Sequence, residues 1–182
     1  NRLKGSNPVA CVEMASTGEV AHLGENLYKA FWGAWRSTEQ QIKGKRVLLS
    51  LGGSTKERLI HEIRVLDKLG WEFYSTPGTH DYLSYNGVAS RCLFKTSDCV
   101  SPDIREIIKN QEVDLIINIP RSAEFRSNTD GFIIRRLAID HRIPLITDLQ
   151  VARVFLNCLI QIEDLFPDVK SWTDYVRKGY EE

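Results

Sequence analysis

Apolar runs typical of strands alternate five times with helical patterns between residues 45 and 162 of this chain. Residues 113–119 show the strand pattern most clearly, because nearly every side chain is apolar, as in a strand that is buried on both faces. Regular alternation predicts an α/β fold with a five-stranded parallel sheet and helices on both sides. The expected strands are residues 45–51, 72–75, 88–94, 113–119 and 144–147, and the expected helices are residues 56–69, 81–86, 130–141, 151–162 and one that begins at residue 101.

The first 42 residues do not continue this alternation and are too short to form a domain with its own core. Residues 25–36 predict a helix, and we expect its tryptophans, Trp32 and Trp35, to be exposed. The polar stretch that follows reads as a linker. The interpretation is therefore that residues 1–42 are the end of a preceding domain plus a linker, and that residues 43–182 form the α/β domain.

Composition narrows the classes of function. The formal net charge of the 182 residues is zero, which does not indicate a basic surface for nucleic acid. No apolar run is long enough to span a bilayer and no signal peptide pattern is present, so we expect a cytoplasmic protein without a membrane partner. The four cysteines and four histidines do not have the spacing of metal ligands. We therefore expect no metal, and the missing GxxxxGK[ST] and GxGxxG motifs predict no cofactor.

The carboxyl ends of parallel strands meet at one edge of the sheet, and a functional site is expected there. One strand runs into the sequence Thr76-Pro-Gly78-Thr79, which we interpret as a turn made tight by Gly78. Two hydroxyls and several backbone N–H groups would then gather before a helix, which is an arrangement that binds anions such as phosphate. An ordinary turn with capping hydroxyls is the alternative.

Four further residues follow strands at this edge. Lys56 begins a helix, where its cation is unfavourable against the positive end of the helix dipole, so that a bound anion or full solvation must explain it. Ser50 and Lys95 add a hydroxyl and a second ammonium group, although a lysine after a strand is commonplace. Asn118 ends a buried strand and must either cap the next loop or contact a ligand.

Two other features bear on the site. The polar loop of residues 121–131 is long for a compact domain, and such loops are usually functional or mobile. Arg135 and Arg136 lie in the helix that follows, and we expect one of them to pair with an acid at the surface. Ser101 is predicted to cap the helix that begins there, with proline in the first turn.

Several segments arrive in the order and spacing of the methylglyoxal-synthase-like fold: VLLSLGGSTKER (47–58), FYSTPGT (73–79), VDLIIN (113–118) and IRRLA (134–138). More narrowly, they resemble the C-terminal regulatory domain of the large subunit of carbamoyl-phosphate synthetase. Residues 13–20, EMASTGEV, are similar to the end of the second ATP-grasp unit of that enzyme.

The resemblance implies a domain that is not an enzyme by itself and that binds a phosphorylated effector, with the rest of a carbamoyl-phosphate synthetase chain as its partner. A uridine nucleotide is the favoured effector, with phosphoribosyl pyrophosphate or inosine monophosphate as alternatives, whereas the urea-cycle form uses N-acetylglutamate. The implied phosphate contacts are Ser50, Lys56, Thr76, Thr79 and Lys95, with Asn118 nearer the sugar or base. The loop of residues 121–131 and Pro120 depart from the bacterial pattern.

Two other functions are alternatives for a chain with these motifs. A stand-alone methylglyoxal synthase acting on dihydroxyacetone phosphate needs a carboxylate base, and the best-aligned position here is Ser101. Asp98 and Asp103 lie close to Ser101 in the sequence, so that a small shift of the alignment would supply a carboxylate at this position. A purely structural domain with a decayed site is the third hypothesis, and the retained Lys56, Thr76 and Thr79 argue against it.

Overall fold

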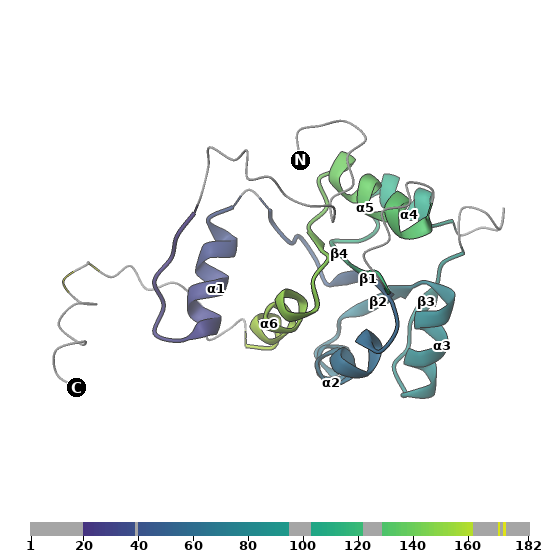
Figure 1. Ribbon diagram of the computed structural model, residues 1–182, viewed down its shortest axis with the longest axis horizontal. Coiled ribbons are helices and arrows are strands. Elements are labelled where there is room, and N and C mark those ends of the chain that lie inside the picture. The colour runs from purple at the N-terminus through teal and green to yellow at the C-terminus, as the bar shows by residue number, and fades with distance from the viewer. Residues whose placement is uncertain are drawn as a thin grey trace.

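The computed structural model describes residues 20–38, 40–94, 103–121 and 129–161, together with Ser171 and Thr173. Within these residues a five-stranded parallel sheet has the strand order β3-β2-β1-β4-β5 (Figure 1). The predicted α/β fold with a parallel sheet is therefore confirmed. The elements are α1 (Leu27–Arg36), β1 (Arg46–Leu51), α2 (Thr55–Lys68), β2 (Glu72–Ser75), α3 (Pro77–Tyr85), β3 (Arg91–Cys92), α4 (Ile104–Lys109), β4 (Leu115–Ile119), α5 (Asp130–Asp140), β5 (Leu145–Ile146) and α6 (Leu149–Ile160).

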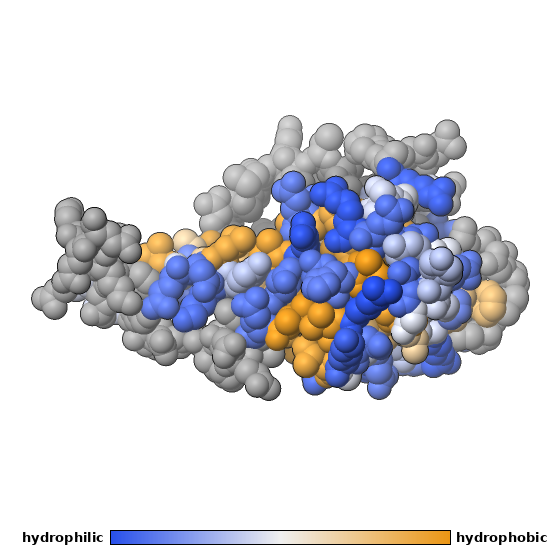
Figure 2. Space-filling view, turned by 90° about the horizontal axis from the view of Figure 1, so that it is seen from below, coloured by the Kyte–Doolittle hydropathy of each residue, from blue (hydrophilic) through white to orange (hydrophobic). Residues whose placement is uncertain are grey.

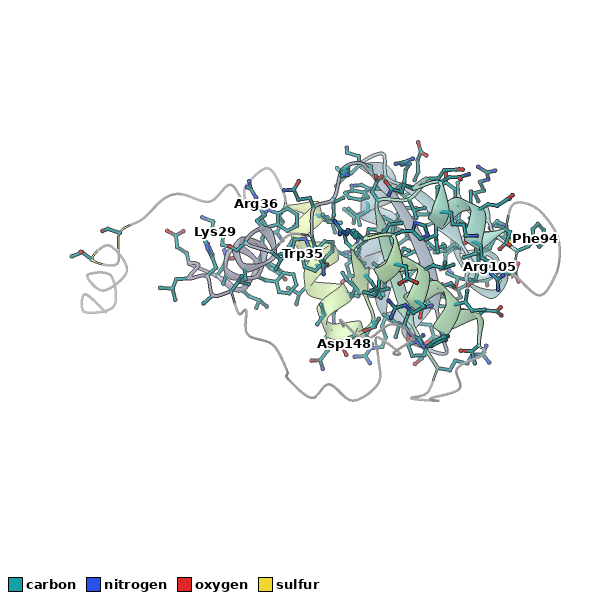
Figure 3. All side chains as sticks on the ribbon, turned by 90° about the horizontal axis from the view of Figure 1, so that it is seen from above. Lys29, Trp35, Arg36, Phe94, Arg105 and Asp148 are labelled. Atoms are coloured by element: carbon teal, nitrogen blue, oxygen red, sulfur yellow. The ribbon has the colours of Figure 1, made fainter. Side chains whose placement is uncertain are left out.

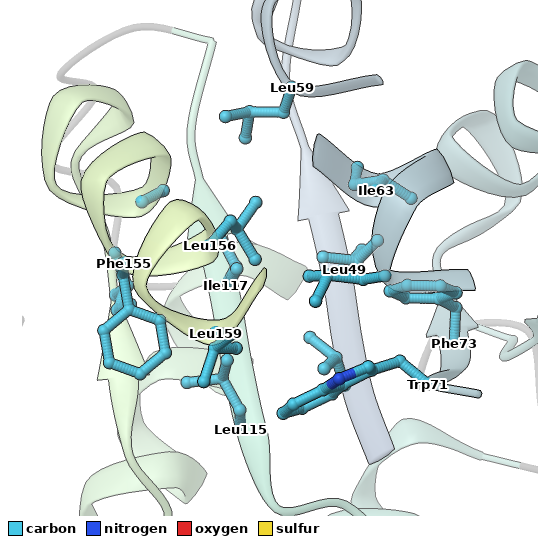
Figure 4. Packing of buried hydrophobic residues seen from close by; sticks show 14 of the residues in the cluster. Leu49, Leu59, Ile63, Trp71, Phe73, Leu115, Ile117, Phe155, Leu156 and Leu159 are labelled. Carbon is cyan, nitrogen blue, oxygen red and sulfur yellow. The ribbon is translucent and has the colours of Figure 1, made fainter. Parts of the chain in front are cut away.

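Successive side chains of the central strands point to opposite faces of the sheet and bury two separate cores. On one face Leu49 packs with Leu59 of α2 and Phe155 of α6 (Figure 4). On the other face Leu48 and Ile116 pack with side chains from α4 and α5. Both faces of β1 and β4 are covered, which explains why their sequences are nearly continuous apolar runs.

The two outer strands are shorter than the sequence pattern predicts. The expected strand of residues 88–94 pairs only over Arg91–Cys92, and that of residues 144–147 pairs only over Leu145–Ile146. Each lies at an edge of the sheet and has a single neighbouring strand. Part of each apolar run therefore consists of side chains that are buried in the core although their backbone does not pair with another strand. Val88, for example, is buried in the core although it lies outside β3.

Two helix starts differ from the predictions. The helix expected at residue 101 begins at Ile104, and its N-cap is Asp103, whose side chain accepts a hydrogen bond from the backbone N–H of Arg105 at 2.9 Å. The prediction of a Ser101 cap is therefore wrong, because the carboxylate two residues later supplies the acceptor; Ser101 itself lies outside the described residues. The helix expected over residues 81–86 begins earlier, at Pro77, since proline is favoured in a first turn.

Helix α1 packs against α6 rather than standing apart (Figure 1). Trp32 is buried, so the prediction that it is exposed is wrong, and its ring centroid lies 5.9 Å from that of Phe155. The ring of Trp35 lies between α1 and α6, and its centroid is 4.5 Å from that of Phe155 (Figure 3).

A cysteine of α6 also contacts α1. The thiol of Cys158 faces the carbonyl oxygen of Tyr28 at 3.6 Å, and burial raises the pKa of this thiol to about 12. The domain boundary at residue 42 stays a prediction.

Apolar side chains remain exposed where the chain enters α1. Val20, Leu23 and Leu27 are 47%, 52% and 62% exposed, and Figure 2 shows hydrophobic surface at the end of the molecule that carries α1. None of the described helices has both the length and the apolar character needed to cross a membrane.

Candidate functional site

The carboxyl ends of β1, β2 and β4 lie side by side, and they place the predicted site residues on one edge of the sheet. Ser50 and Asn118 are register partners on β1 and β4. The backbone N–H of Thr76, directly after β2, donates to the carbonyl oxygen of Leu49 at 3.2 Å. Residues far apart in sequence thus meet because the strands are parallel and adjacent, as expected for an open α/β sheet.

The segment Thr76–Thr79 forms the start of a helix and not the separate turn that the sequence suggested. Thr76 is the N-cap of α3, and Gly78 lies within its first turn without a positive φ angle. Thr79 is buried, and its Oγ1 accepts a hydrogen bond from the backbone N–H of Leu51 at 3.1 Å. The Thr76 hydroxyl donates to the same oxygen at 3.3 Å. The Thr79 hydroxyl therefore holds β1 against α3.

Lys56 connects the amino ends of two helices. It is the second residue of α2, and its Nζ donates a hydrogen bond to the carbonyl oxygen of Gly78 in the first turn of α3. Its ammonium group therefore lies where the positive ends of two helix dipoles converge, an unfavourable place for a cation unless an anion is also bound. An anion at this point would meet the ammonium group, backbone N–H groups and the Thr76 hydroxyl.

A pocket of about 240 Å³ opens beside this group, between the ends of β1 and β4 and the start of α5. Its lining residues are Ser50, Leu51, Gly52, Asn118, Ile119, Pro120, Arg121, Thr129, Gly131 and Arg135. Two of the predicted site residues, Ser50 and Asn118, belong to its wall, whereas Lys56, Thr76 and Thr79 do not. Leu51 joins the two parts, because it lines the pocket while its N–H binds Thr79.

Arg135 is the pocket residue that sequence reasoning missed. Its side chain is buried, and Nη1 donates to Oδ1 of Asn118 at 2.7 Å. Burial lowers its pKa, yet the guanidinium stays charged at neutral pH because arginine titrates far above it. The expected pairing of one of the two arginines with a surface acid is made by Arg136, which contacts Asp140 at 2.6 Å. A signal was present, since Arg135 lies three residues before the buried Ala138, a spacing that places both on one face of the helix.

Other candidates lie outside what the structure describes. Lys95, Ser101 and Asp98 fall in residues 95–102, so Lys95 stays a prediction. Of the possible lyase bases only Asp103 is described, and its carboxylate caps α4. Among the described ranges, no group of three or more histidine, cysteine, aspartate or glutamate side chains could hold a metal ion.

Replacing Thr79 by valine is expected to lower the free energy of unfolding by about 1–2 kcal/mol, because the buried N–H of Leu51 loses its acceptor. Urea denaturation of the wild type and the variant measures the difference. Thr76→Val is the matched control, and we expect a change within about 0.5 kcal/mol because its side chain makes no cap hydrogen bond to the backbone. Equal stabilities of wild type and Thr79→Val would show that the hydroxyl does not hold β1.

Comparison with known proteins gives matches along most of the chain. Residues 58–147 match the family model of the MGS-like domain. The multifunctional protein URA2 of Saccharomyces cerevisiae is 34% identical over 168 residues, covering 87% of this chain. The multifunctional protein CAD of Squalus acanthias is 35% identical and covers 96% of this chain. The mitochondrial carbamoyl-phosphate synthase [ammonia] of Homo sapiens is 35% identical and covers 87%.

The chain is similar to only a small part of each relative, since it spans 8%, 8% and 11% of their respective lengths. Among solved structures, methylglyoxal synthase from Elizabethkingia anophelis NUHP1 aligns with a TM-score of 0.48 and 16% identity, over 72% of this chain and 90% of that one.

Proposed function

This chain carries a domain of the MGS-like family, and we propose that it is the effector-binding regulatory domain of a carbamoyl-phosphate synthetase. The effector is a phosphorylated small molecule, with a uridine nucleotide favoured. The domain catalyses no reaction by itself. The parent protein, an ATP-dependent ligase of pyrimidine biosynthesis, makes carbamoyl phosphate, and the rest of that chain is the partner that the domain regulates.

The observation that carries this proposal is the position of Lys56. A lysine at the amino end of α2, hydrogen-bonded to the first turn of α3, is costly without an anion and favourable with one. The Thr76 side chain makes no cap hydrogen bond to the backbone, and its hydroxyl would exchange its 3.3 Å bond to Thr79 Oγ1 for one to a ligand. A phosphate group offers acceptor oxygens to all of these donors at once.

Regulation requires that the effector bind two states of the parent protein with different affinities. Helix α1 belongs to residues 1–42, which are predicted to be the end of the preceding domain plus a linker. It packs on α6, and α6 packs on α2. Since α2 begins beside the proposed phosphate, these contacts give a physical connection between the effector and the preceding part of the chain. A stand-alone lyase is less favoured, because Asp103, its one described candidate base, caps a helix.

A panel of ligands tests the proposal. We expect uridine mono- or triphosphate to raise the melting temperature of the chain, since a ligand at one hundred times its dissociation constant adds about 2.7 kcal/mol of stability. Inosine monophosphate, phosphoribosyl pyrophosphate and N-acetylglutamate complete the panel. If N-acetylglutamate alone stabilises the chain, or none of the five does, the proposed nucleotide function is wrong. Formation of methylglyoxal from dihydroxyacetone phosphate would support the lyase instead.

Lys56→Ala is expected to weaken the binding of the phosphorylated ligand about tenfold, because one charge-assisted hydrogen bond is lost and water partly screens the exposed ammonium group. Calorimetric titration gives the two dissociation constants. Lys68→Ala, at the other end of α2, is the matched control and should bind as the wild type does. Increasing salt should weaken wild-type binding as well. If Lys56→Ala and the wild type bind the ligand with equal affinity, the phosphate is not held at the start of α2.

A further inference from the structure

The pocket beside the proposed phosphate contacts has one unusual property, which is its excess of hydrogen-bond donors. Two of its lining residues are arginines, Arg121 and Arg135, and none of the lining residues that the structure describes is an aspartate or glutamate. Arg135 is 3% exposed, so its guanidinium group is part of the pocket's inner wall rather than a surface charge. A guanidinium group donates hydrogen bonds and accepts none.

The bond between Arg135 and Asn118 also orients the amide of Asn118. Because Oδ1 accepts from Arg135 Nη1 at 2.7 Å, the amide is turned so that Nδ2 is its remaining polar atom, and Nδ2 is a donor. Gly131, in the first turn of α5, keeps this pair uncovered. A Cβ atom there would lie 3.1 Å from Nη1 of Arg135 and 3.8 Å from Nδ2 of Asn118.

The pocket and the phosphate contacts are neighbours at the carboxyl end of β1. Leu51 belongs to both, because it lines the pocket and its N–H is hydrogen-bonded to Thr79. A volume of about 240 Å³ is below the roughly 300–1,000 Å³ of pockets that enclose a whole small-molecule ligand. A ligand with its phosphate at Lys56 would therefore place only its far end in the pocket.

We propose that this pocket selects the far end of the effector by its acceptor oxygens, so that it takes a base with oxo groups, such as uracil or hypoxanthine, and rejects one with an amino group in the same place. This inference rests on the proposed function, because it needs the phosphate of a nucleotide to be held at Lys56. Arg135 and the Nδ2 atom of Asn118 donate to the oxo group. An amino group there would bring donor against donor and leave buried groups without partners.

Two matched pairs of nucleotides provide the test, because each pair differs in an oxo or amino substituent. Uridine monophosphate is compared with cytidine monophosphate, and inosine monophosphate with adenosine monophosphate, by calorimetric titration of the whole chain. We expect the oxo member of at least one pair to bind at least tenfold more tightly than the amino member. Arg135→Met should bring that ratio close to one, whereas Arg136→Met should leave the ratio unchanged, because Arg136 pairs with Asp140 and does not line the pocket.

Asn118→Asp provides a second variant in case Arg135→Met does not fold. It keeps the size of the side chain and the contact with Arg135, but it replaces the donor Nδ2 by an acceptor oxygen. The affinity for uridine monophosphate should fall more than tenfold while that for cytidine monophosphate falls less or rises. A purely structural role for Asn118 would weaken both nucleotides equally.

The outcomes separate this inference from the proposed function. If oxo and amino members bind equally well to the wild type, or if the ratio survives in both Arg135→Met and Asn118→Asp, the inference is wrong and the nucleotide site stands. If no nucleotide binds the wild type, the inference and the nucleotide function fail together. Selectivity in the wild type that is lost in Arg135→Met, or reversed in Asn118→Asp, supports both.

Discussion

Phe155→Ala is expected to lower the free energy of unfolding by about 3–5 kcal/mol, the range found when a large aromatic side chain is removed from a core. Phe155 is fully buried on α6. Its ring contacts three aromatic side chains of α1, with centroid distances of 6.3 Å to Phe31, 5.9 Å to Trp32 and 4.5 Å to Trp35. The loss therefore includes the burial of Phe155 itself and much of the contact that holds α1 in place.

Urea denaturation followed by tryptophan fluorescence measures this effect, because Trp32 and Trp35 lie in the contact between α1 and α6. Val151→Ala on the same helix is the matched control, since Val151 is 39% exposed and should change stability by less than about 1 kcal/mol. We also expect a shift in the emission of the folded Phe155→Ala variant, as water reaches the indole rings. A small loss of stability with unchanged emission would mean that α1 does not depend on Phe155.

Asp114→Asn is expected to cost about 2–3 kcal/mol at neutral pH, because the carboxylate loses charge-assisted hydrogen bonds to a partly exposed arginine. Arg46 donates from Nε to Oδ2 and from Nη2 to Oδ1, both at 2.9 Å, and the backbone N–H of Arg46 adds a third bond at 3.1 Å. These bonds tie the start of β1 to the residue that precedes β4. Gly44 is close by, and a Cβ atom there would lie 2.6 Å from Oδ2 of Asp114.

The same pair predicts a dependence of stability on pH. Burial alone would raise the pKa of Asp114, but the hydrogen bonds and charge of Arg46 outweigh burial, so that the pKa lies below its usual value in the folded protein. A carboxyl group with a lowered pKa contributes stability above its unfolded pKa of about 3.9, and this contribution is lost as the pH falls through the folded value. The difference in stability between wild type and Asp114→Asn should therefore be full at pH 7 and shrink below about pH 4.

Denaturant titrations at pH 7, 5, 4 and 3 check this expectation. Asp67→Asn serves as the control for the loss of one carboxylate elsewhere, and its difference from the wild type should stay within about 0.5 kcal/mol throughout. A difference for Asp114→Asn that is constant across this range would show that the Asp114 carboxylate is not held ionised by Arg46.

The local patterns of the sequence predicted the order and type of the helices and strands, although not all of their bounds, and they picked out residues that the fold brings to one edge of the sheet. The apolar run ending at Asn118 predicted a buried central strand, and β4 is that strand. The order of strands and helices predicted a parallel sheet, which in turn predicted that Ser50 and Asn118 meet at one edge. Lys56 could be recognised because a cation at the start of a helix contradicts the helix dipole, and such a contradiction is visible without a structure.

Only the tertiary structure decided which side chains meet across these elements. Asn118 and Arg135 are 17 residues apart, and their bond depends on how α5 returns to β4 after the crossover. Trp32 belongs to a helix whose own periodicity does not reveal that α6 covers it. Periodicity records how one segment is divided between polar and apolar faces, and therefore determines the elements and their layers. The partner of each buried polar or aromatic side chain is set by the packing of one element on another, which the pattern of a single segment does not contain.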